Sequence, residues 1–359
     1  MPVITRYFTK EFLKTLALCL SSFVALYLLV DLFERLDDIV EHKASFSQVV
    51  KYCLYQIPMI VYQVLPLGIL LCTFITLGIF VKNNEITAIK AHGISLFSVL
   101  KTFVFISSLF CVFSLFLQEF VLPHTNWQVK KIKNIHIKGK KEATYLKKED
   151  FWFRSKNRIC KIGYFDPGKN RLYNITLFYF DPEFRVEKKI EAESAVWTKD
   201  HWVFNNGAER SFKKTGEMKT KKFKSREIAI DKVPEDFMSF RKESEEMSFT
   251  EIRAFINKTK QEGYPTVSFE ADMHAKISYS FICIIMAVLG IPFSLMIGRS
   301  GGMALGIAIS LALGFVYWTF FAFCLSLGKG GELAPFVSAW SANLAFGFLG
   351  LYLFLHVRQ

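Results

Sequence analysis

The chain has 359 residues, more than half of them hydrophobic, and a mean hydropathy of +0.26. This composition excludes an ordinary soluble protein and places the chain among membrane proteins. The formal net charge of +13 indicates contact with anionic lipid or an anionic substrate. The basic residues gather on no recognisable nucleic-acid module, so we expect no nucleic-acid partner. None of the seven cysteines has a CxxC or Cys/His spacing, and therefore no metal site is expected.

Three long apolar segments precede a polar block at 123–269, and three follow it. A bilayer core of about 30 Å needs roughly 20 apolar residues at about 1.5 Å each, so every segment can cross a membrane as a helix. Met1–Thr15 is either an amphipathic lead-in helix on the membrane surface or the start of the first span. The predicted spans are Phe12–Phe33, Tyr52–Val81, Leu96–Leu122, Ile277–Ile297, Met303–Leu327 and Phe336–His356.

Lys and Arg are concentrated in one set of the short loops, and this bias sets the expected orientation. If the N-terminus is cytoplasmic, the inner loops carry most of these basic residues, while the first outer loop is acidic at Asp37, Asp38 and Glu41. Both termini are then expected in the cytoplasm and the polar block outside. The positive charge of that block does not oppose this topology, because long domains are translocated largely regardless of charge.

The polar block contains runs typical of β-strands that are separated by turn sequences. Because no helical pattern lies between these runs, an antiparallel sandwich or jelly roll is expected. The predicted fold is a membrane α-helical bundle of six transmembrane helices with an extracytoplasmic antiparallel β-jelly-roll domain. The strands are expected at 150–155, 158–165, 172–180, 185–197 and 202–212, with turns at 156–157, 166–168, 181–182 and 205–207.

The chain is expected to divide into three parts. Residues 1–122 hold the lead-in helix and the first three spans, 123–247 the jelly roll, and 248–359 a connecting helix and the last three spans. The connecting helix has a capping-box spacing at Ser248 and Glu251, and Gly263 can end it.

No catalytic motif is apparent in the chain. The Gly-rich runs at 298–302 and 328–331 lack the GxxxxGK[ST] order of a phosphate-binding loop, so the chain itself is not expected to hydrolyse ATP. No arrangement of nucleophile and base or of paired carboxylates stands out either. We therefore expect no enzyme activity in this chain.

A short polar segment at 83–95, between the second and third predicted spans, is a candidate coupling site. Asn83 or Asn84 can cap a helix there, Glu85 suits its first turn, and Gly93 can end it. Such a helix can dock into a groove on a cytoplasmic partner. It can equally be an ordinary solvated connector.

Small residues recur at four-residue steps along the fifth predicted span. This spacing places them on one helix face and lets another backbone approach closely, either from this chain or from another subunit. The four residues are Gly302, Gly306, Ser310 and Gly314.

Charged residues gather where the spans meet the polar block. The basic residues can hold phosphates of an anionic amphiphile, or they can anchor the spans by snorkelling. Asp31 is costly inside a span and is expected to face protein or water, or to lie in the headgroup layer. The candidate phosphate-binding residues are Arg35, Lys130, Lys131 and Lys133.

Several motifs resemble one family. The run NEITAIKAHGIS at 84–95 closely resembles the cytoplasmic coupling-helix motif of the lipopolysaccharide-export permeases LptF and LptG. The runs VLPLG at 64–68, HAKI at 274–277 and LGIP at 289–292 are similar to the same family. FERLDD at 33–38 and NNEI at 83–86 look more like LptG than LptF. LptG-type chains can carry Lys near the end of the first span, where this chain has Asp31, so Arg35 is the nearest basic substitute.

The resemblance implies a permease subunit of an ATP-driven exporter that extracts lipopolysaccharide from the bacterial inner membrane and passes it to a periplasmic bridge. It implies a paralogous LptF-type permease, a cytoplasmic LptB ATPase dimer that binds ATP and Mg, and LptC beside the jelly roll. It implies no cofactor in this chain. The first and fifth spans would form lateral openings, with the small-residue face between subunits. Coupling to the ATPase would fall on Asn84, Glu85, Ile86, Lys90, His92 and Gly93.

Two other functions compete with export. A multi-span scaffold or sensor would bind a protein partner through its periplasmic domain without transport, although two spans would suffice to anchor it. An ion-coupled transporter would need buried acids in the middle of a span, and none is convincingly placed.

Overall fold

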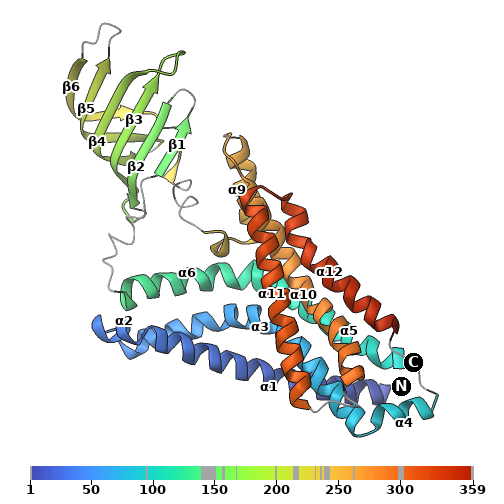
Figure 1. Ribbon diagram of the computed structural model, residues 1–359. Helices are drawn as coiled ribbons and strands as arrows, with labels where there is room; N and C mark the ends of the chain where they lie inside the picture. The colour runs from blue at the N-terminus through green and yellow to red at the C-terminus, as the bar shows by residue number, and fades with distance from the viewer. Residues whose placement is uncertain are drawn as a thin grey trace. The chain divides into compact units, whose positions relative to one another are not determined.

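Two units make up the chain, as the contacts in its computed structural model show (Figure 1). The helical unit contains Met1–Lys130, Ser244–Asn257 and Pro265–Gln359, and the β unit contains Lys131–Glu243 and Lys258–Tyr264. The structure describes residues 2–93, 96–138, 151–155, 158–166, 168–198, 200–212, 218–230, 232–234, 237, 243–261, 263–297 and 303–356.

Long apolar helices form the helical unit (Figure 1). Among the described residues, six stretches are long and apolar enough to cross a membrane, which confirms the predicted bundle. The helix α1 runs without a break, so the N-terminal stretch is continuous with the first span. The long helices are α1 (Pro2–Glu34), α3 (Phe46–Lys82), α5 (Leu96–Phe116), α10 (Val267–Ile297), α11 (Met303–Gly330) and α12 (Pro335–His356).

Shorter helices connect these spans. In the helical unit, α5 continues through the π-helical turn η1 (Leu117–Val121) into α6, and the 3-10 turn η3 (Ser244–Glu246) precedes α9. A further π-helical turn, η2 (Lys133–Ile137), follows α6. The short α-helices are α2 (Leu36–Glu41), α4 (Glu85–Ala91), α6 (Leu122–Ile132) and α9 (Phe249–Gln261).

Helix α10 is the centre of the bundle, because α3, α5, α11 and α12 all pack against it. Polar groups tie it to its neighbours: the Ser114 and Ser280 hydroxyls lie 3.0 Å apart, and the Asn343 side-chain amide donates to the Ser278 backbone carbonyl at 2.7 Å. Such bonds bring helices close together where both sides are apolar and no water competes. The four helices around α10 therefore form a tightly connected body.

The α9 helix begins as the capping-box spacing predicts. The Ser248 backbone N–H donates to the Glu251 carboxylate at 3.0 Å, and the Glu251 N–H donates to the Ser248 hydroxyl at 3.1 Å. Gly263 follows the helix with φ of +81°, a conformation that glycine adopts at little cost.

Among the described residues of the β unit, six antiparallel strands form one sheet in simple sequence order (Figure 1). This confirms the expected antiparallel β domain, while the jelly-roll arrangement stays a prediction. The strands are β1 (Phe151–Ser155), β2 (Arg158–Asp166), β3 (Arg171–Phe180), β4 (Val186–Thr198), β5 (His201–Phe212) and β6 (Met218–Ile228).

Two features of the sheet differ from the prediction. Strand β6 was not predicted, because its run of lysines does not resemble the apolar alternation of a half-buried strand. It is the edge strand of the sheet, and its charges oppose pairing with a strand of another chain. Residues 205–207 were expected to form a turn but lie inside β5. Asn205, Asn206 and Gly207 therefore lie at a bend within the strand, and the chain does not reverse its direction there.

That bend belongs to a crease that crosses five strands. On either side of the crease the strands keep the same register, but one residue of each strand is skipped in the ladder. Two of these residues, Asn174 and Asn206, have φ of +52°, a conformation that Asn tolerates better than most side chains. The skipped residues are Gly163, Asn174, Glu193, Asn206 and Lys224.

One face of the sheet carries the core of the β unit. Ile162, Ile175 and Ala192 point to this face on one side of the crease, and Phe165 and Leu172 on the other. Trp202 is fully buried, and its indole N–H donates to the Lys232 carbonyl at 2.8 Å. Because side chains alternate along a strand, the residues between these positions point to the opposite face.

Candidate functional site

The predicted coupling segment folds as the short helix α4 between α3 and α5 (Figure 1). Left-handed residues bound it on both sides, with φ of +61° at Asn84 and +70° at Gly93. Ile86 is only 5% exposed and belongs to the same apolar cluster as Phe8 and Phe80. The helix is therefore fixed to the bundle by its apolar face, whereas a solvated connector would need no such anchor.

The polar residues of α4 lie toward its accessible side. Glu85 is half-buried, accepts a hydrogen bond from the Asn83 amide at 3.4 Å, and lies beside the Tyr7 side chain of α1. The exposed His92 ring contacts the Ala88 carbonyl at 2.8 Å. Lys90 belongs to the helix, but its side chain lies outside the described residues. Glu85 thus stands where α1, α3 and α4 meet.

A buried polar cluster occupies the C-terminal end of α1. Asp31 is 7% exposed, and its carboxylate accepts hydrogen bonds from the Arg35 guanidinium at 2.8 to 3.1 Å and from the Tyr52 hydroxyl at 2.7 Å. The guanidinium also lies 5.5 Å from the centre of the Tyr52 ring. Asp31 therefore faces protein, as expected, and the cluster ties α1 to α3. A phosphate would have to compete with Asp31 for Arg35.

The other three candidate phosphate ligands are divided between the helical unit and the β unit. Lys130, at the end of the helical unit, forms an ion pair with Glu246 at 2.8 Å. Lys131 and Lys133 belong to the β unit. Arg35 and Lys130 are thus each paired with an acid of their own unit, and the phosphate-binding role of all four residues stays a prediction.

The small-residue face of α11 packs against α3 of the same chain. A side chain at Gly306 would overlap the Phe74 ring, and a Cβ atom at Gly314 would lie 2.5 Å from the Leu67 side chain. Ser310 is 4% exposed, and Gly302 lies outside the described residues. The close helix approach thus occurs within this chain, and a role of this face at a lateral opening stays a prediction.

Sequence reasoning missed the polar residues of the π-helical turn η1. The Glu119 carboxylate accepts hydrogen bonds from the Phe249 N–H and the Thr250 hydroxyl, both at 2.7 Å, and so caps α9. Gln118 accepts a hydrogen bond from the Tyr62 hydroxyl at 2.9 Å inside the bundle. A π-turn changes which side chains share a helix face, and no periodicity in the sequence reveals it.

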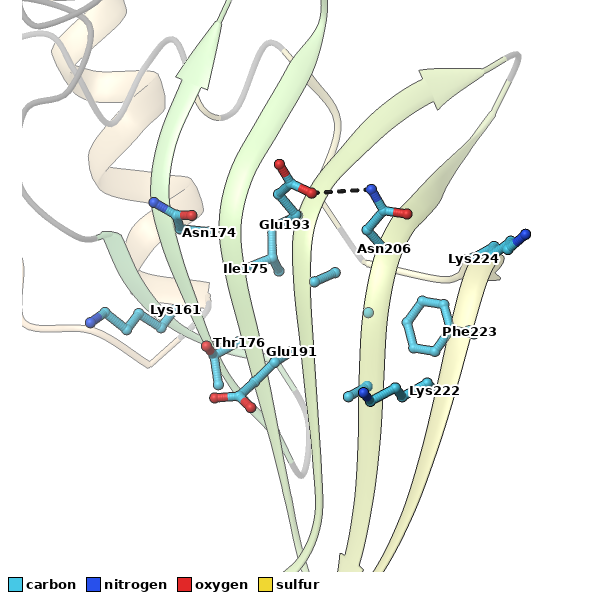
Figure 2. A pocket seen from close by; sticks show the side chains of 13 residues that line it. Lys161, Asn174, Ile175, Thr176, Glu191, Glu193, Asn206, Lys222, Phe223 and Lys224 are labelled. Atoms are coloured by element: carbon cyan, nitrogen blue, oxygen red, sulfur yellow. Dashed lines mark hydrogen bonds between the residues drawn. The ribbon is translucent and has the colours of Figure 1, made fainter.

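The β unit has a trough of about 970 Å³ across β2 to β6 (Figure 2). Its labelled side chains carry amide, carboxylate, hydroxyl and ammonium groups, and the Asn206 amide donates to Glu193 at 3.1 Å. Among the described residues, no group of three or more His, Cys, Asp or Glu is placed to hold a metal ion.

A comparison with protein families places nearly the whole chain in one family. The family model described as lipopolysaccharide export system permease LptF/LptG matches residues 6–356. A search of curated proteins finds no match. The family model covers both the helical unit with its six candidate spans and the β unit, so the match agrees with the observed architecture. The chain belongs to the LptF/LptG family of lipopolysaccharide export permeases, and is accordingly a multi-pass inner-membrane transport protein.

Proposed function

We propose that this chain is the permease subunit of an ATP-driven exporter that extracts lipopolysaccharide from the inner membrane. The observation that carries this proposal is α4, a short polar helix anchored by Ile86 to the core of the helical unit in a chain of the permease family. No phosphate-binding loop is apparent in the sequence, so a separate cytoplasmic ATPase would bind ATP and Mg.

The contacts of α4 suggest how a movement of the cytoplasmic partner would be transmitted to the membrane-spanning helices. A partner that moves Glu85 would also displace Tyr7 on α1, because the two side chains lie beside each other. The apolar contacts of Ile86 with the cluster of Phe8 and Phe80 would carry the same displacement to α1 and α3. Packed side chains cannot deform continuously, so a small shift at α4 would move whole helices.

The cavity for the lipid would be apolar and would form beside α1 and α11. Both helices expose large apolar side chains, among them Leu29 and Phe33 on α1 and Phe315 and Trp318 on α11. Each buried CH₂ of an acyl chain favours an apolar environment by about 0.8 kcal/mol, so extraction requires both another apolar surface and external energy. Arg35, Lys130, Lys131 and Lys133 would bind the phosphates of the headgroup.

The proposed partners follow from this arrangement. A paralogous LptF-type permease would complete the cavity, which makes this chain the LptG-type subunit, and an LptB dimer would receive α4 from the cytoplasm. Both termini would then be cytoplasmic, and the β unit would lie in the periplasm, where it would pass lipopolysaccharide to LptC and the bridge.

Photocrosslinking in living cells tests the substrate. A photoreactive residue at Phe33, which is 70% exposed on α1, is expected to give an adduct detected by antibody to lipopolysaccharide. Phe348 on α12, which is 68% exposed, is the matched control and is expected to give a much weaker adduct. Lack of an adduct at Phe33, and at a second photoreactive residue placed at Lys130, would contradict the assignment of the substrate.

A further inference from the structure

The face of the β sheet opposite its core has an unusual surface. Lys161 follows the buried Cys160, and Thr176 and Glu191 each stand between two buried residues, so all three side chains point away from the core. Together with Lys222 they form one row across the sheet, in direct register. The exposed crease residues form the adjacent row, and the trough lies between the two rows (Figure 2).

The polar groups of the trough are held in place. The Glu191 carboxylate is fixed by Lys189 at 2.7 Å and Arg210 at 2.5 Å, and the hydrogen bond from Lys189 keeps the pKa of Glu191 below its ordinary value. Glu193 is held by the Asn206 amide. Ala208 lies between Glu191 and Lys222 in the first row, and its small side chain leaves the space that deepens the trough.

Two stacked aromatic pairs flank the trough on the same face. The rings of Trp152 and Phe178 lie 6.3 Å apart with 8° between their planes, and Trp152 is 56% exposed. Beyond the crease, the rings of Tyr164 and Tyr173 lie 4.3 Å apart with 6° between their planes. A cation stands beside each pair: the Lys161 ammonium lies 5.5 Å from the Trp152 ring, and the Arg171 guanidinium lies 5.4 Å from the Tyr173 ring.

The crease that shapes this surface has an energetic cost. Left-handed backbone at Asn174 and Asn206 costs about 1 kcal/mol or more at each position. A Cβ atom at Gly163 would lie 2.8 Å from the Asn174 Cβ atom, so the crease also requires this glycine. Residues held in rare backbone conformations cluster where a protein binds ligands, and both asparagines line the trough.

We propose that this face of the β unit binds a saccharide that carries anionic substituents. Sugar rings present an apolar C–H face that packs on aromatic rings such as Trp152, and hydroxyl groups that pair with amides and carboxylates. Lys161, Lys222 and Lys224 supply the positive charge for phosphate or carboxylate substituents. This inference rests on the proposed function and extends it: the saccharide is the sugar portion of lipopolysaccharide.

Other ligands fit the surface less well. Acyl chains would require a continuous apolar lining, but most residues that line the trough are polar or charged, and most aliphatic side chains of the sheet are buried on the opposite face. A polyanion such as nucleic acid would be repelled by Glu191 and Glu193, which lie among the lysines of the trough. Mixed charges beside exposed aromatic rings suit a ligand that has hydroxyl groups along its whole length.

Titration of the full chain in nanodiscs tests this site. The ligand is the core oligosaccharide of lipopolysaccharide, freed of lipid A, and binding is followed by saturation-transfer NMR. Trp152→Ala is expected to weaken binding at least tenfold, and Glu193→Gln severalfold. Trp152→Phe keeps the aromatic platform and is expected to stay within about threefold of the native chain. Tyr352→Ala, which removes an aromatic side chain that is 59% exposed on α12, is expected to leave binding unchanged.

The outcomes separate this inference from the proposed function. If the native chain does not bind the lipid-free oligosaccharide while Phe33 still crosslinks to whole lipopolysaccharide, this inference is wrong and the export function stands. If the oligosaccharide binds but Trp152→Ala and Glu193→Gln leave its affinity unchanged, the site is elsewhere and the inference is also wrong. If Trp152→Ala does not fold, the affinities of the correctly folded Trp152→Phe and Glu193→Gln chains for the oligosaccharide test the inference instead.

Discussion

Glu85→Lys is expected to abolish association of the permease with its cytoplasmic ATPase. The substitution reverses the charge in the first turn of α4, where an acid is favoured by the helix dipole, and removes the carboxylate that lies beside Tyr7. Truncating one partner of a buried charged pair in an interface costs about 2–5 kcal/mol, and a reversed charge adds repulsion. We therefore expect at least a thirtyfold loss of ATPase that copurifies with the detergent-solubilised complex, together with loss of export.

Glu41→Lys is the matched control for this prediction. Glu41 ends another short helix, α2, and is exposed to solvent, but it lies far from α4 in the sequence and in the fold (Figure 1). The same charge change there is expected to leave the copurified ATPase unchanged. Retention of the ATPase by the Glu85→Lys chain would contradict the coupling role of α4.

The second large effect is expected from Asp31→Ala. Removal of the carboxylate leaves the largely buried Arg35 guanidinium without its counterion and the Tyr52 hydroxyl without its hydrogen-bond acceptor. Breaking one partner of a buried ion pair costs about 3–5 kcal/mol, so the helical unit should unfold at a clearly lower temperature. Thiol-reactive fluorophores can follow this unfolding, because Cys19, Cys72 and Cys283 are buried in the native helical unit.

Two variants show whether the cost comes from the cluster itself. Tyr52→Phe removes only one hydrogen bond to Asp31 and is expected to cost about 1–2 kcal/mol. Asp31→Ala combined with Arg35→Ala removes both charges and should recover much of the stability lost in the single variant, since residues in contact do not act additively. If Asp31→Ala unfolds at the native temperature, the cluster does not tie α1 to α3.

Much of the helical unit was predictable because its signals are local. Long apolar runs predict spans whatever their neighbours are, and the Ser248 and Glu251 spacing predicts the start of α9 from four residues of sequence. The polar segment after α3 predicts α4 in the same way, since Asn84 and Gly93 favour the left-handed conformations that bound it. The anchoring of α4 through Ile86 depends on contacts with distant residues and appears only in the structure.

What the sequence did not reveal depends on pairing across the chain. Arg35 carries the same charge whether it is free or bonded to Asp31, and the contribution of Tyr52 from another helix is not visible in the sequence. Strand β6 has too few apolar residues to be recognised and is defined by its ladder with β5. Asn206 was predicted to lie in a turn because a left-handed conformation occurs both where a chain reverses its direction and where a strand bends.

Reconstitution tests the central proposal most directly. Liposomes that contain this permease, its paralogous partner, the cytoplasmic ATPase and lipopolysaccharide would be mixed with a soluble periplasmic acceptor. On addition of ATP and Mg²⁺, the proposal predicts transfer of lipopolysaccharide to the acceptor, with no transfer when ATP cannot be hydrolysed or when Glu85 is replaced by Lys. Hydrolysis of ATP at the normal rate with all lipopolysaccharide remaining in the liposomes would contradict it.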